Sequence, residues 1–298
     1  MTGTLYLIGT PIGNLEDMTY RAVRVLGEAD LIACEDTRTS GVLLKHFDIH
    51  TPLISYHKFN ENERGEELVD KLLAGQNLAL ITDAGMPGIS DPGEVLVRMC
   101  HEAGITVTAV PGPSAVVTAL ALSGRDTRRF SFEGFLPQEK KEREEVLMEM
   151  KTETRTMILY EAPHRLAKTL GALKETLGGE RRISLCRELT KKFETVTDTT
   201  IDEAMEALEL TPARGEYVLV LAGRDPGEAE AERAASFAEI PLADHVASYE
   251  TQGMSRKEAM KAAAKDRGLS RREVYQALLE ESVKFIEDFL ERLGYLER

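Results

Sequence analysis

The chain has 298 residues, of which 42% are hydrophobic, so it is long enough for two domains with sizeable cores. Its formal net charge of −14 argues against a protein whose whole surface binds nucleic acid, because screening confines the effect of a charge to about 10 Å. Any contact with nucleic acid is therefore expected to be regional.

Cysteine usage and the N-terminal sequence favour a cytoplasmic location. Cys34, Cys100 and Cys186 lie in apolar or mixed runs without CxxC spacing, which indicates buried thiols in a reducing compartment. The N-terminus lacks the basic region and apolar stretch of an export signal. The uncharged stretch 104–124 is interrupted by Pro111-Gly112-Pro113, so we expect a buried strand, a turn and a buried helix there and no membrane span.

Short apolar runs alternate with amphipathic stretches over the first 123 residues. This alternation indicates a mostly parallel sheet covered by helices. The predicted strands are Leu5–Gly9, Leu31–Cys34, Leu53–Ser55, Leu78–Thr82 and Thr106–Val110.

A second α/β pattern follows from about Phe130. Its predicted strands are Thr156–Tyr160, Ile183–Arg187 and Glu216–Ala222, and its predicted helices are Arg165–Leu177 and Ile201–Leu208. The fold class is therefore α/β, with two tandem α/β domains over residues 1–113 and 114–224.

After Gly223 the composition becomes polar without apolar periodicity, which predicts a linker over 225–238 and a helical module over 239–298. Within the module, a helix over 255–265, a glycine turn and a helix from 271 have the spacing of a helix-turn-helix. Ser255 and Ser270 are predicted N-caps, each followed three residues later by a capping-box glutamate, Glu258 and Glu273.

Basic residues of this module are candidates for contact with nucleic acid. Lys257, Lys261 and Lys265 recur every four residues along the first helix, and Arg271 and Arg272 begin the second, where backbone amides also face outward. The alternative is a solvated helical module that binds no ligand, since charged helix faces usually face water.

Three turn-rich loops follow predicted strands, at residues 9–14, 82–93 and 110–115. The first matches neither GxGxxG nor GxxxxGK[ST], which disfavours a dinucleotide or ATP site. In a parallel sheet all three loops emerge at the carboxyl edge and can line one pocket, with Ile12 and Met86 as apolar walls and Asp83 as a carboxylate. The alternative for each loop is a tight turn that serves packing alone.

Several motifs together resemble a known family. They are Leu7–Asn14, Glu35–Arg38, Ser55-Tyr56-His57, Asn60-Glu61, Asp83–Gly93, Val110–Ser114, Tyr160–Arg165, Glu216–Leu219 and the helix-turn-helix tail. On these residues the chain resembles the tetrapyrrole methylase superfamily and, within it, the bacterial ribosomal RNA small subunit methyltransferase I family, over essentially its whole length. The Gly9-Thr10-Pro11 and Thr82-Asp83-Ala84 sequences depart from the broad superfamily and follow the rRNA branch.

The resemblance implies S-adenosylmethionine bound between two α/β domains and methyl transfer to a cytidine 2′-hydroxyl in the decoding region of 16S rRNA. It also implies the small ribosomal subunit as partner and a cytoplasmic homodimer. The cofactor contacts carried over by motif are Pro11, Ile12, Asp83, Gly85, Met86, Pro113, Ser114 and Ala115.

Transfer to a hydroxyl requires a general base within reach of the oxygen, directly or through one water. The candidates at predicted strand ends are Glu35, Asp36, His57, Glu161 and His164. We favour Glu161 with His164, because Pro163 would hold a turn that presents both, and we keep Asp36 as a third catalytic candidate. The alternatives are that Glu161 pairs with Arg165, that His164 caps a helix and that Asp36 is an N-cap.

Further residues are candidates for RNA contacts near the cleft. Arg38 and Arg165 could grip phosphates through bidentate contacts, and Tyr56 or His57 could stack on the target base. His46 and His50 have HxxxH spacing without the zincin glutamate, so no bound metal is predicted.

Three other functions compete with this interpretation. A small-molecule or tetrapyrrole methyltransferase of the same fold would not need a basic helix-turn-helix. A non-catalytic ribosome-assembly protein would not need three intact ligand loops. A DNA-binding regulator is the third alternative, because helix-turn-helix modules commonly read DNA.

Overall fold

The structure is a computed structural model that describes residues 2–225, 227 and 234–292. Residues 1–223 form one compact unit and residues 224–298 a second. Half of the predicted linker over 225–238, namely residues 226 and 228–233, lies outside the described residues. The predicted boundary between two α/β domains stays a prediction, because both predicted domains fall inside the first unit.

A five-stranded sheet is built by the first part of the chain, and every strand pair in it is parallel. The strand order is β3-β2-β4-β1-β5, so the chain crosses over repeatedly and all carboxyl ends meet at one edge. The five predicted strands are confirmed to within one residue at each end: β1 (Thr4–Ile8), β2 (Leu31–Cys34), β3 (Leu53–Ser55), β4 (Leu78–Ile81) and β5 (Thr106–Val110).

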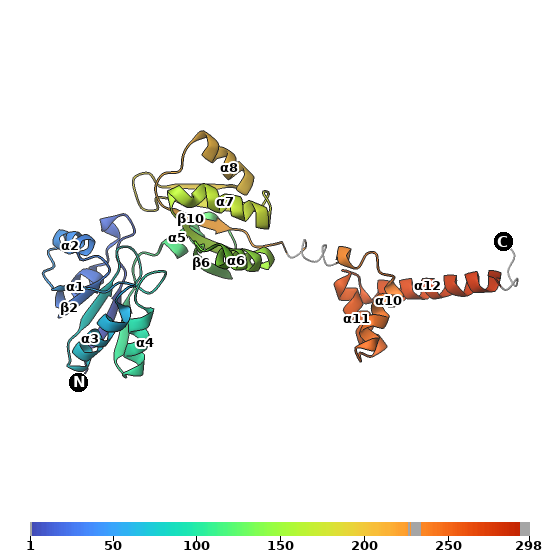
Figure 1. Cartoon of the computed structure of the whole chain (residues 1–298), viewed down its shortest axis with the longest axis horizontal. Helices are drawn as coiled ribbons and strands as arrows, with labels where there is room; N and C mark the ends of the chain where they lie inside the picture. Colours follow the sequence, from blue (N-terminus) through green and yellow to red (C-terminus); the bar gives the residue numbers. More distant parts are fainter. Residues whose placement is uncertain (1, 226, 228–233, 293–298) are drawn as a thin grey trace. The chain divides into compact units, whose positions relative to one another are not determined.

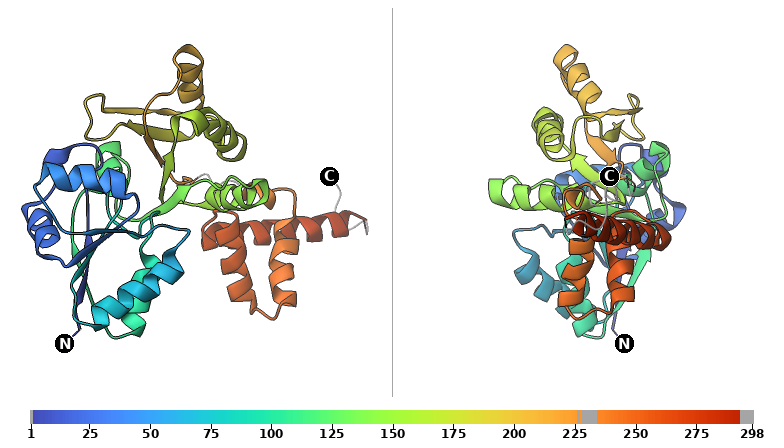
Figure 2. Two further views of the ribbon diagram at one scale, coloured as in Figure 1. Left: turned by 60° about the vertical axis from the view of Figure 1, so that its left-hand side comes forward. Right: turned by 90° about the vertical axis from the view of Figure 1, so that its right-hand side faces the viewer.

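Helices cover both faces of this sheet (Figures 1 and 2). Leu26 and Leu44 belong to one buried cluster, whereas Leu72 and Leu96 belong to another that contains the opposite face of the strands. The helices of the first face are α1 (Tyr20–Glu28) and α2 (Thr37–His46), which follow the short 3₁₀ turn η1 (Leu15–Asp17), and those of the second face are α3 (Glu61–Leu73) and α4 (Glu94–Glu102).

The expectation of a buried strand within 104–124 is wrong. β5 is an edge strand, and Thr106, Thr108 and Ala109 on it are exposed. The helix that follows, α5 (Ala115–Ser123), buries Ala119 and Leu120 but leaves Val117 53% exposed. The prediction failed because an uncharged strand rich in threonine can be buried or exposed.

The second sheet is mixed, with strand order β6-β7-β10-β8-β9. β6 pairs with β7 in parallel, and the other three pairs are antiparallel. The three predicted strands are the three central ones, and the two edge strands were not predicted. The elements are β6 (Phe130–Phe135), α6 (Lys140–Thr152), β7 (Thr156–Glu161), α7 (Pro163–Leu177), β8 (Arg182–Arg187), β9 (Thr195–Thr200), α8 (Ile201–Leu210) and β10 (Tyr217–Leu221).

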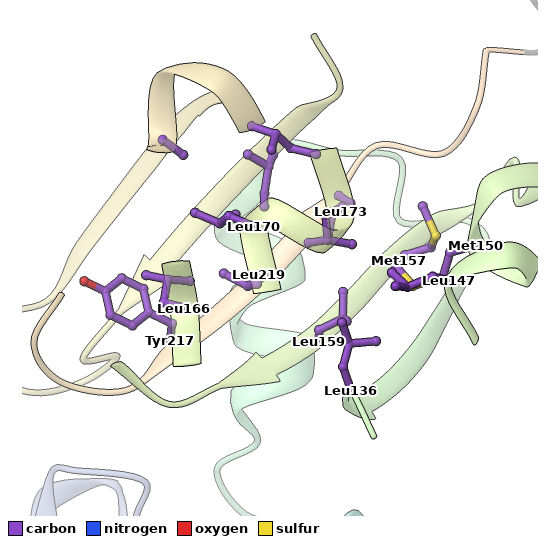
Figure 3. Close-up of a cluster of buried hydrophobic side chains, with 14 residues drawn as sticks. Leu136, Leu147, Met150, Met157, Leu159, Leu166, Leu170, Leu173, Tyr217 and Leu219 are labelled. Atoms are coloured by element: carbon purple, nitrogen blue, oxygen red, sulfur yellow. The ribbon is translucent and has the colours of Figure 1, made fainter. Parts of the chain in front are cut away.

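Two hydrophobic layers hold this sheet. On one face, Leu166 and Leu170 of α7 pack in a cluster with Leu159 and Leu219 of the central strands (Figure 3). On the other face, α5 inserts Ala119 and Leu120 among side chains that include Cys186 and Val218. The four residues between β5 and α5 therefore lead the chain from the first sheet to a helix that packs on the second.

The second unit contains three described helices, α10 (Leu242–Thr251), α11 (Arg256–Asp266) and α12 (Arg271–Arg292). Their core includes Val246, Met260, Ala263 and Val274. The predicted helix, turn and helix over 255–278 are confirmed. Both predicted capping boxes are confirmed as well, since Ser255 and Ser270 each donate a backbone N–H to the carboxylate three residues later.

None of the helices in the described part of the chain is long and apolar enough to cross a membrane. The thiols of Cys34, Cys100 and Cys186 are all free and buried, which confirms their predicted structural role.

Candidate functional site

A cavity of about 290 Å³ lies in the first unit, at the carboxyl edge of the first sheet. This volume is close to the lower limit of small-molecule sites, about 300 Å³. One wall is formed by the loops that follow β1, β4 and β5. The facing wall comes from the ends of β6 and β7, the loop after β8 and the start of β10.

The three loops of the first wall touch one another because glycines allow it. A Cβ on Gly9 would lie 2.7 Å from Cα of Gly112, and a Cβ on Gly112 would lie 2.8 Å from the carbonyl oxygen of Gly9. Thr10 and Gly85 exchange two backbone hydrogen bonds of 2.9 and 3.1 Å. Gly85 has φ +82°, a conformation that favours glycine, so the loop after β4 can turn back toward the first.

The structure brings most of the predicted cofactor residues to one surface. Pro11 and Pro113 are not among the cavity-lining residues, although the Pro113 carbonyl lies next to Gly85. The predicted residues that line the cavity are Ile12, Asp83, Gly85, Met86, Ser114 and Ala115.

Carboxyl groups of the first wall repel one another. Burial, followed by the charges of Glu35 and Asp83, raises the pKa of Asp91 to about 6. Burial and the neighbouring Asp36 raise the pKa of Asp83, although a backbone N–H of Asp36 partly opposes the shift. Burial and Asp83 likewise raise the pKa of Glu35. A bound cation would relieve this repulsion.

The facing wall carries a lysine between two carboxylates. Lys191 Nζ lies 2.9 Å from Glu188 Oε1 and 2.8 Å from Glu216 Oε2. Burial opposes the charged form of Lys191, but the hydrogen bonds to Glu216 and Glu188 outweigh it and raise the pKa of the ammonium. The backbone N–H of Glu216 and then Lys191 lower the pKa of Glu188.

Glu161 lines the cavity, but its carboxylate interacts with neighbouring groups of the protein. The side chain is fully buried, and Oε1 accepts the backbone N–H of Ala162 at 2.8 Å and lies 3.5 Å from Arg165 Nε. The Thr169 hydroxyl donates to Oε2. His164 is exposed and is not among the cavity-lining residues, so the structure does not bring the favoured pair together at the cavity.

The remaining site candidates of the first sheet lie outside the cavity lining. Asp36 caps α2 by accepting the backbone N–H of Arg38 at 2.8 Å, and hydrogen bonds from the Arg38 side chain and backbone lower the pKa of Asp36 to about 2. Arg38 is exposed. The backbone of His57 donates to Asn60 Oδ1, and its ring meets the exposed Phe59 edge-on at 6.2 Å.

Arg165 is anchored to the protein, since Nη2 donates to the carbonyl of Leu136 at 2.6 Å. In the second unit, all the predicted RNA contacts are exposed on α11 and α12: Lys257, Lys261, Arg271 and Arg272.

Several cavity residues were missed by the sequence analysis as individual site residues. Asp91 lies in the predicted binding loop over 82–93, and Glu216 lies in the motif Glu216–Leu219. Both are charged residues in segments already expected at the site, so they could have been chosen from the sequence. Tyr160, whose pKa burial and then Asp91 raise to about 12, ends a predicted strand. Lys191 gave no signal, because it reaches the cavity only through the turn after β8.

The cavity suits a cation that carries both polar and apolar parts. Ile12, Met86 and Leu189 supply apolar wall. Asp83 and Asp91 supply carboxylates whose pKa values are raised, first by burial and then by neighbouring carboxylates. The buried hydroxyl of Thr82, next to Asp83, has no hydrogen-bond partner. Among the described residues, no group of three histidines, cysteines or carboxylates could hold a metal ion.

Comparisons with known proteins agree with this architecture. Residues 4–205 match the family model of Tetrapyrrole (Corrin/Porphyrin) Methylases. The fold resembles that of the methyltransferase CobJ, with a TM-score of 0.56 and 16% identity over 75% of this chain and 95% of that chain. It also resembles uroporphyrin-III-C-methyltransferase from Thermus thermophilus, with a TM-score of 0.52 and 20% identity over 74% and 94%.

Sequence relatives are much more similar. Ribosomal RNA small subunit methyltransferase I of Synechocystis sp. is 49% identical over 93% of this chain and 98% of its own length. The protein of the same name from Bacillus subtilis is 44% identical over 92% and 94%. The chain therefore belongs to the tetrapyrrole methylase family and, within it, to the ribosomal RNA small subunit methyltransferase I family.

Proposed function

We propose that this protein uses S-adenosylmethionine to methylate the 2′-hydroxyl of a cytidine ribose in the decoding region of 16S rRNA. The observation that carries the proposal is the cavity at the carboxyl edge of the first sheet, in a chain nearly half identical to a small subunit rRNA methyltransferase. We further propose that it acts on the small ribosomal subunit, in the cytoplasm and as a homodimer.

The cofactor would be held by the first wall. Ile12 and Met86 would contact its apolar parts, the loop around Ser114 and Ala115 would offer backbone groups, and Asp83 and Asp91 would face its positive charge. When bound, S-adenosylmethionine supplies an electrophilic methyl group. The chain's own task is to align the acceptor oxygen with that group and to remove its proton, and alignment alone can supply much of the rate.

Glu161 is proposed as a positioning residue for this site. It fixes Arg165 and the first turn of α7 beside the cavity. Arg38 and His57 stay candidates for contacts with the RNA outside the cavity, and His164 and Asp36 stay catalytic candidates although they do not line the cavity. The exposed basic residues of α11 and α12 are proposed to bind rRNA phosphates, because such contacts supply affinity that is independent of base sequence.

The test is methyl transfer from labelled S-adenosylmethionine to purified small subunits that lack the modification. Free 16S rRNA, duplex DNA and a tetrapyrrole precursor serve as parallel acceptors. We expect label on a ribose 2′-oxygen of the subunit, located by nuclease digestion and mass spectrometry. Label on the tetrapyrrole alone, or on none of the acceptors, would overturn the proposal.

A further inference from the structure

The turn after β8 is built to hold Lys191 in one place. Glu188 and Thr190 have φ of +51° and +65°, which non-glycine residues rarely adopt. Such strain persists only where the surroundings impose it, and it gathers at functional sites. Leu189 is buried and lines the cavity, so the turn is anchored between the two strained residues.

Two glycines make room for this turn. A Cβ on Gly13 would lie 2.5 Å from Cγ of Lys191, and a Cβ on Gly215 would lie 2.4 Å from Cγ of Glu188. Gly13 belongs to the loop after β1, and Gly215 precedes β10. Two separate segments therefore leave room for the Lys191 and Glu188 side chains.

The two carboxylates beside Lys191 differ in what they do. Glu188 Oε1 accepts both from Lys191 Nζ and from the backbone N–H of Glu216 at 3.0 Å, and its side chain is only 19% exposed. Glu216 receives Nζ on Oε2, and its side chain is 79% exposed at the cavity. Glu188 thus fixes the lysine, whereas Glu216 remains accessible to a ligand.

An ammonium and an accessible carboxylate 2.8 Å apart match a group that both accepts and donates a hydrogen bond. A hydroxyl does both. A phosphate would be repelled by two carboxylates, and a carbon acceptor would have no oxygen for the ammonium to contact. The pair therefore favours a hydroxyl as the methyl acceptor.

We propose, resting on the function proposed above, that Glu216 takes the proton of the acceptor 2′-hydroxyl and that Lys191 stabilises the negative charge that develops on its oxygen. In this step an oxygen lone pair forms the bond to the methyl carbon, the bond from that carbon to sulfur breaks with its electron pair left on sulfur, and the hydroxyl proton passes to the Glu216 carboxylate. The ammonium keeps its protons throughout.

The experiment compares Glu216→Gln, Lys191→Met and Lys191→Arg with the wild type on small subunits that lack the modification. Lys174→Met is the matched control, because Lys174 also pairs with a carboxylate, Asp202 at 2.7 Å, but does not line the cavity. Single-turnover rates are measured from about pH 6 to about pH 9, and S-adenosylmethionine affinity is measured by calorimetry for each variant.

Loss of the base should lower the rate by about 10²–10⁴-fold, and loss of the ammonium by about 10²–10³-fold. We expect Lys191→Arg to recover part of the rate, all variants to bind the cofactor with affinity close to that of the wild type, and the control to behave like the wild type. In Glu216→Gln the rate should rise with pH across the whole range, since solvent hydroxide must replace the carboxylate.

A Glu216→Gln rate close to that of the wild type, or a pH profile that does not change, would overturn this inference while leaving the ribose methylation intact. A rate loss fully explained by weaker cofactor binding would overturn it too. If the wild type puts no label on ribose, the proposed function itself fails, and this inference fails with it.

Discussion

The two walls of the cavity hold their carboxylates in opposite ways. On the first wall, burial raises the pKa values of Asp83 and Asp91, and the charges of neighbouring carboxylates add to the shift, Asp36 for Asp83 and then Glu35 and Asp83 for Asp91. On the second wall, Glu188 and Glu216 share Lys191, and the pKa of Glu188 is lowered. The first wall is thus prepared for a positive ligand, whereas the second already contains its own cation.

This difference follows from where the groups lie. The first wall collects side chains from three neighbouring parallel strands, whose carboxyl ends converge whatever their charges. The second wall is built from a strained turn and the start of an antiparallel strand, which bring a lysine and two glutamates into direct contact. The carboxylates that converge on the first wall repel one another, whereas the strained turn of the second wall places a lysine between two glutamates.

Removing Glu161 should give the largest loss of stability, because its carboxylate is fully buried in the second wall. Glu161→Ala leaves Arg165 unpaired and the Thr169 hydroxyl without its acceptor. We expect a loss of about 3–5 kcal/mol in the free energy of unfolding, measured in denaturant. Glu161→Gln should cost less and keep part of the activity. A folded Glu161→Gln protein that binds the cofactor but has no activity would instead make Glu161 the base.

The second largest effect on stability is expected from a methyl group added where the loops of the first wall touch. Gly112→Ala would place a Cβ 2.8 Å from the Gly9 carbonyl oxygen, which should cost about 1–3 kcal/mol and weaken cofactor binding. The matched control is Gly27→Ala in α1, where nothing lies within 4 Å of the added Cβ. It should stabilise the protein by about 0.5–1 kcal/mol. Equal effects of the two substitutions on cofactor affinity would contradict a specific contact at the cavity.

The arginines at the start of α12 test whether RNA affinity arises outside both walls. Arg271→Ala with Arg272→Ala should weaken binding to small-subunit rRNA by about tenfold and reduce the salt dependence by about one phosphate contact per arginine. Arg24→Ala with Arg98→Ala is the control, since both are exposed and paired within their own helices. Cofactor affinity should be unchanged in both double variants, as titration calorimetry would show.

Asp91 should give the smallest effect, and one that depends on pH. Its pKa is about 6 in the folded protein and about 3.9 in the unfolded chain, so the folded state binds the proton more tightly and wild-type stability falls as pH rises from about 4 to about 6. Asp91→Asn removes this cost. We expect it to raise the melting temperature by about 2–4 °C at pH 8 and by little at pH 4. A variant less stable than the wild type at pH 8 would show that the ionised carboxylate is paired.

Sequence patterns predicted the framework of the protein because its strands are apolar or mixed and its loops have distinctive turn residues. They missed the edge strands of the second sheet: β9 carries alternating threonines, and β6 contains a glycine with φ +63° and a register shift at that point. They also missed α6, where charged residues dominate and only Leu147 and Met150 are buried. Edge elements need few apolar residues, so their periodicity is weak.

The first wall of the site was predictable, whereas the second was not. The three loops of the first wall follow parallel strands that are neighbours in the sheet, so topology alone gathers Ile12, Asp83 and Ser114. Lys191 joins them only because the turn after β8 is strained and packs against glycines of other segments, a tertiary fact that no local pattern encodes. Glu161 was recognised, but its burial, which decides its role, depends on α7.

The position of β10 has a consequence for synthesis on the ribosome. β10 is the central strand of its sheet, yet it is the last of the five to be translated. A nascent chain that ends before Tyr217 can pair β6 with β7 and β8 with β9, but no strand then connects these two ribbons by backbone hydrogen bonds. The apolar surface of α5 and α7 that β10 covers stays open to chaperones until β10 emerges, and the same strand then brings Glu216 to the cavity. Completion of the sheet and completion of the site are therefore one cotranslational event.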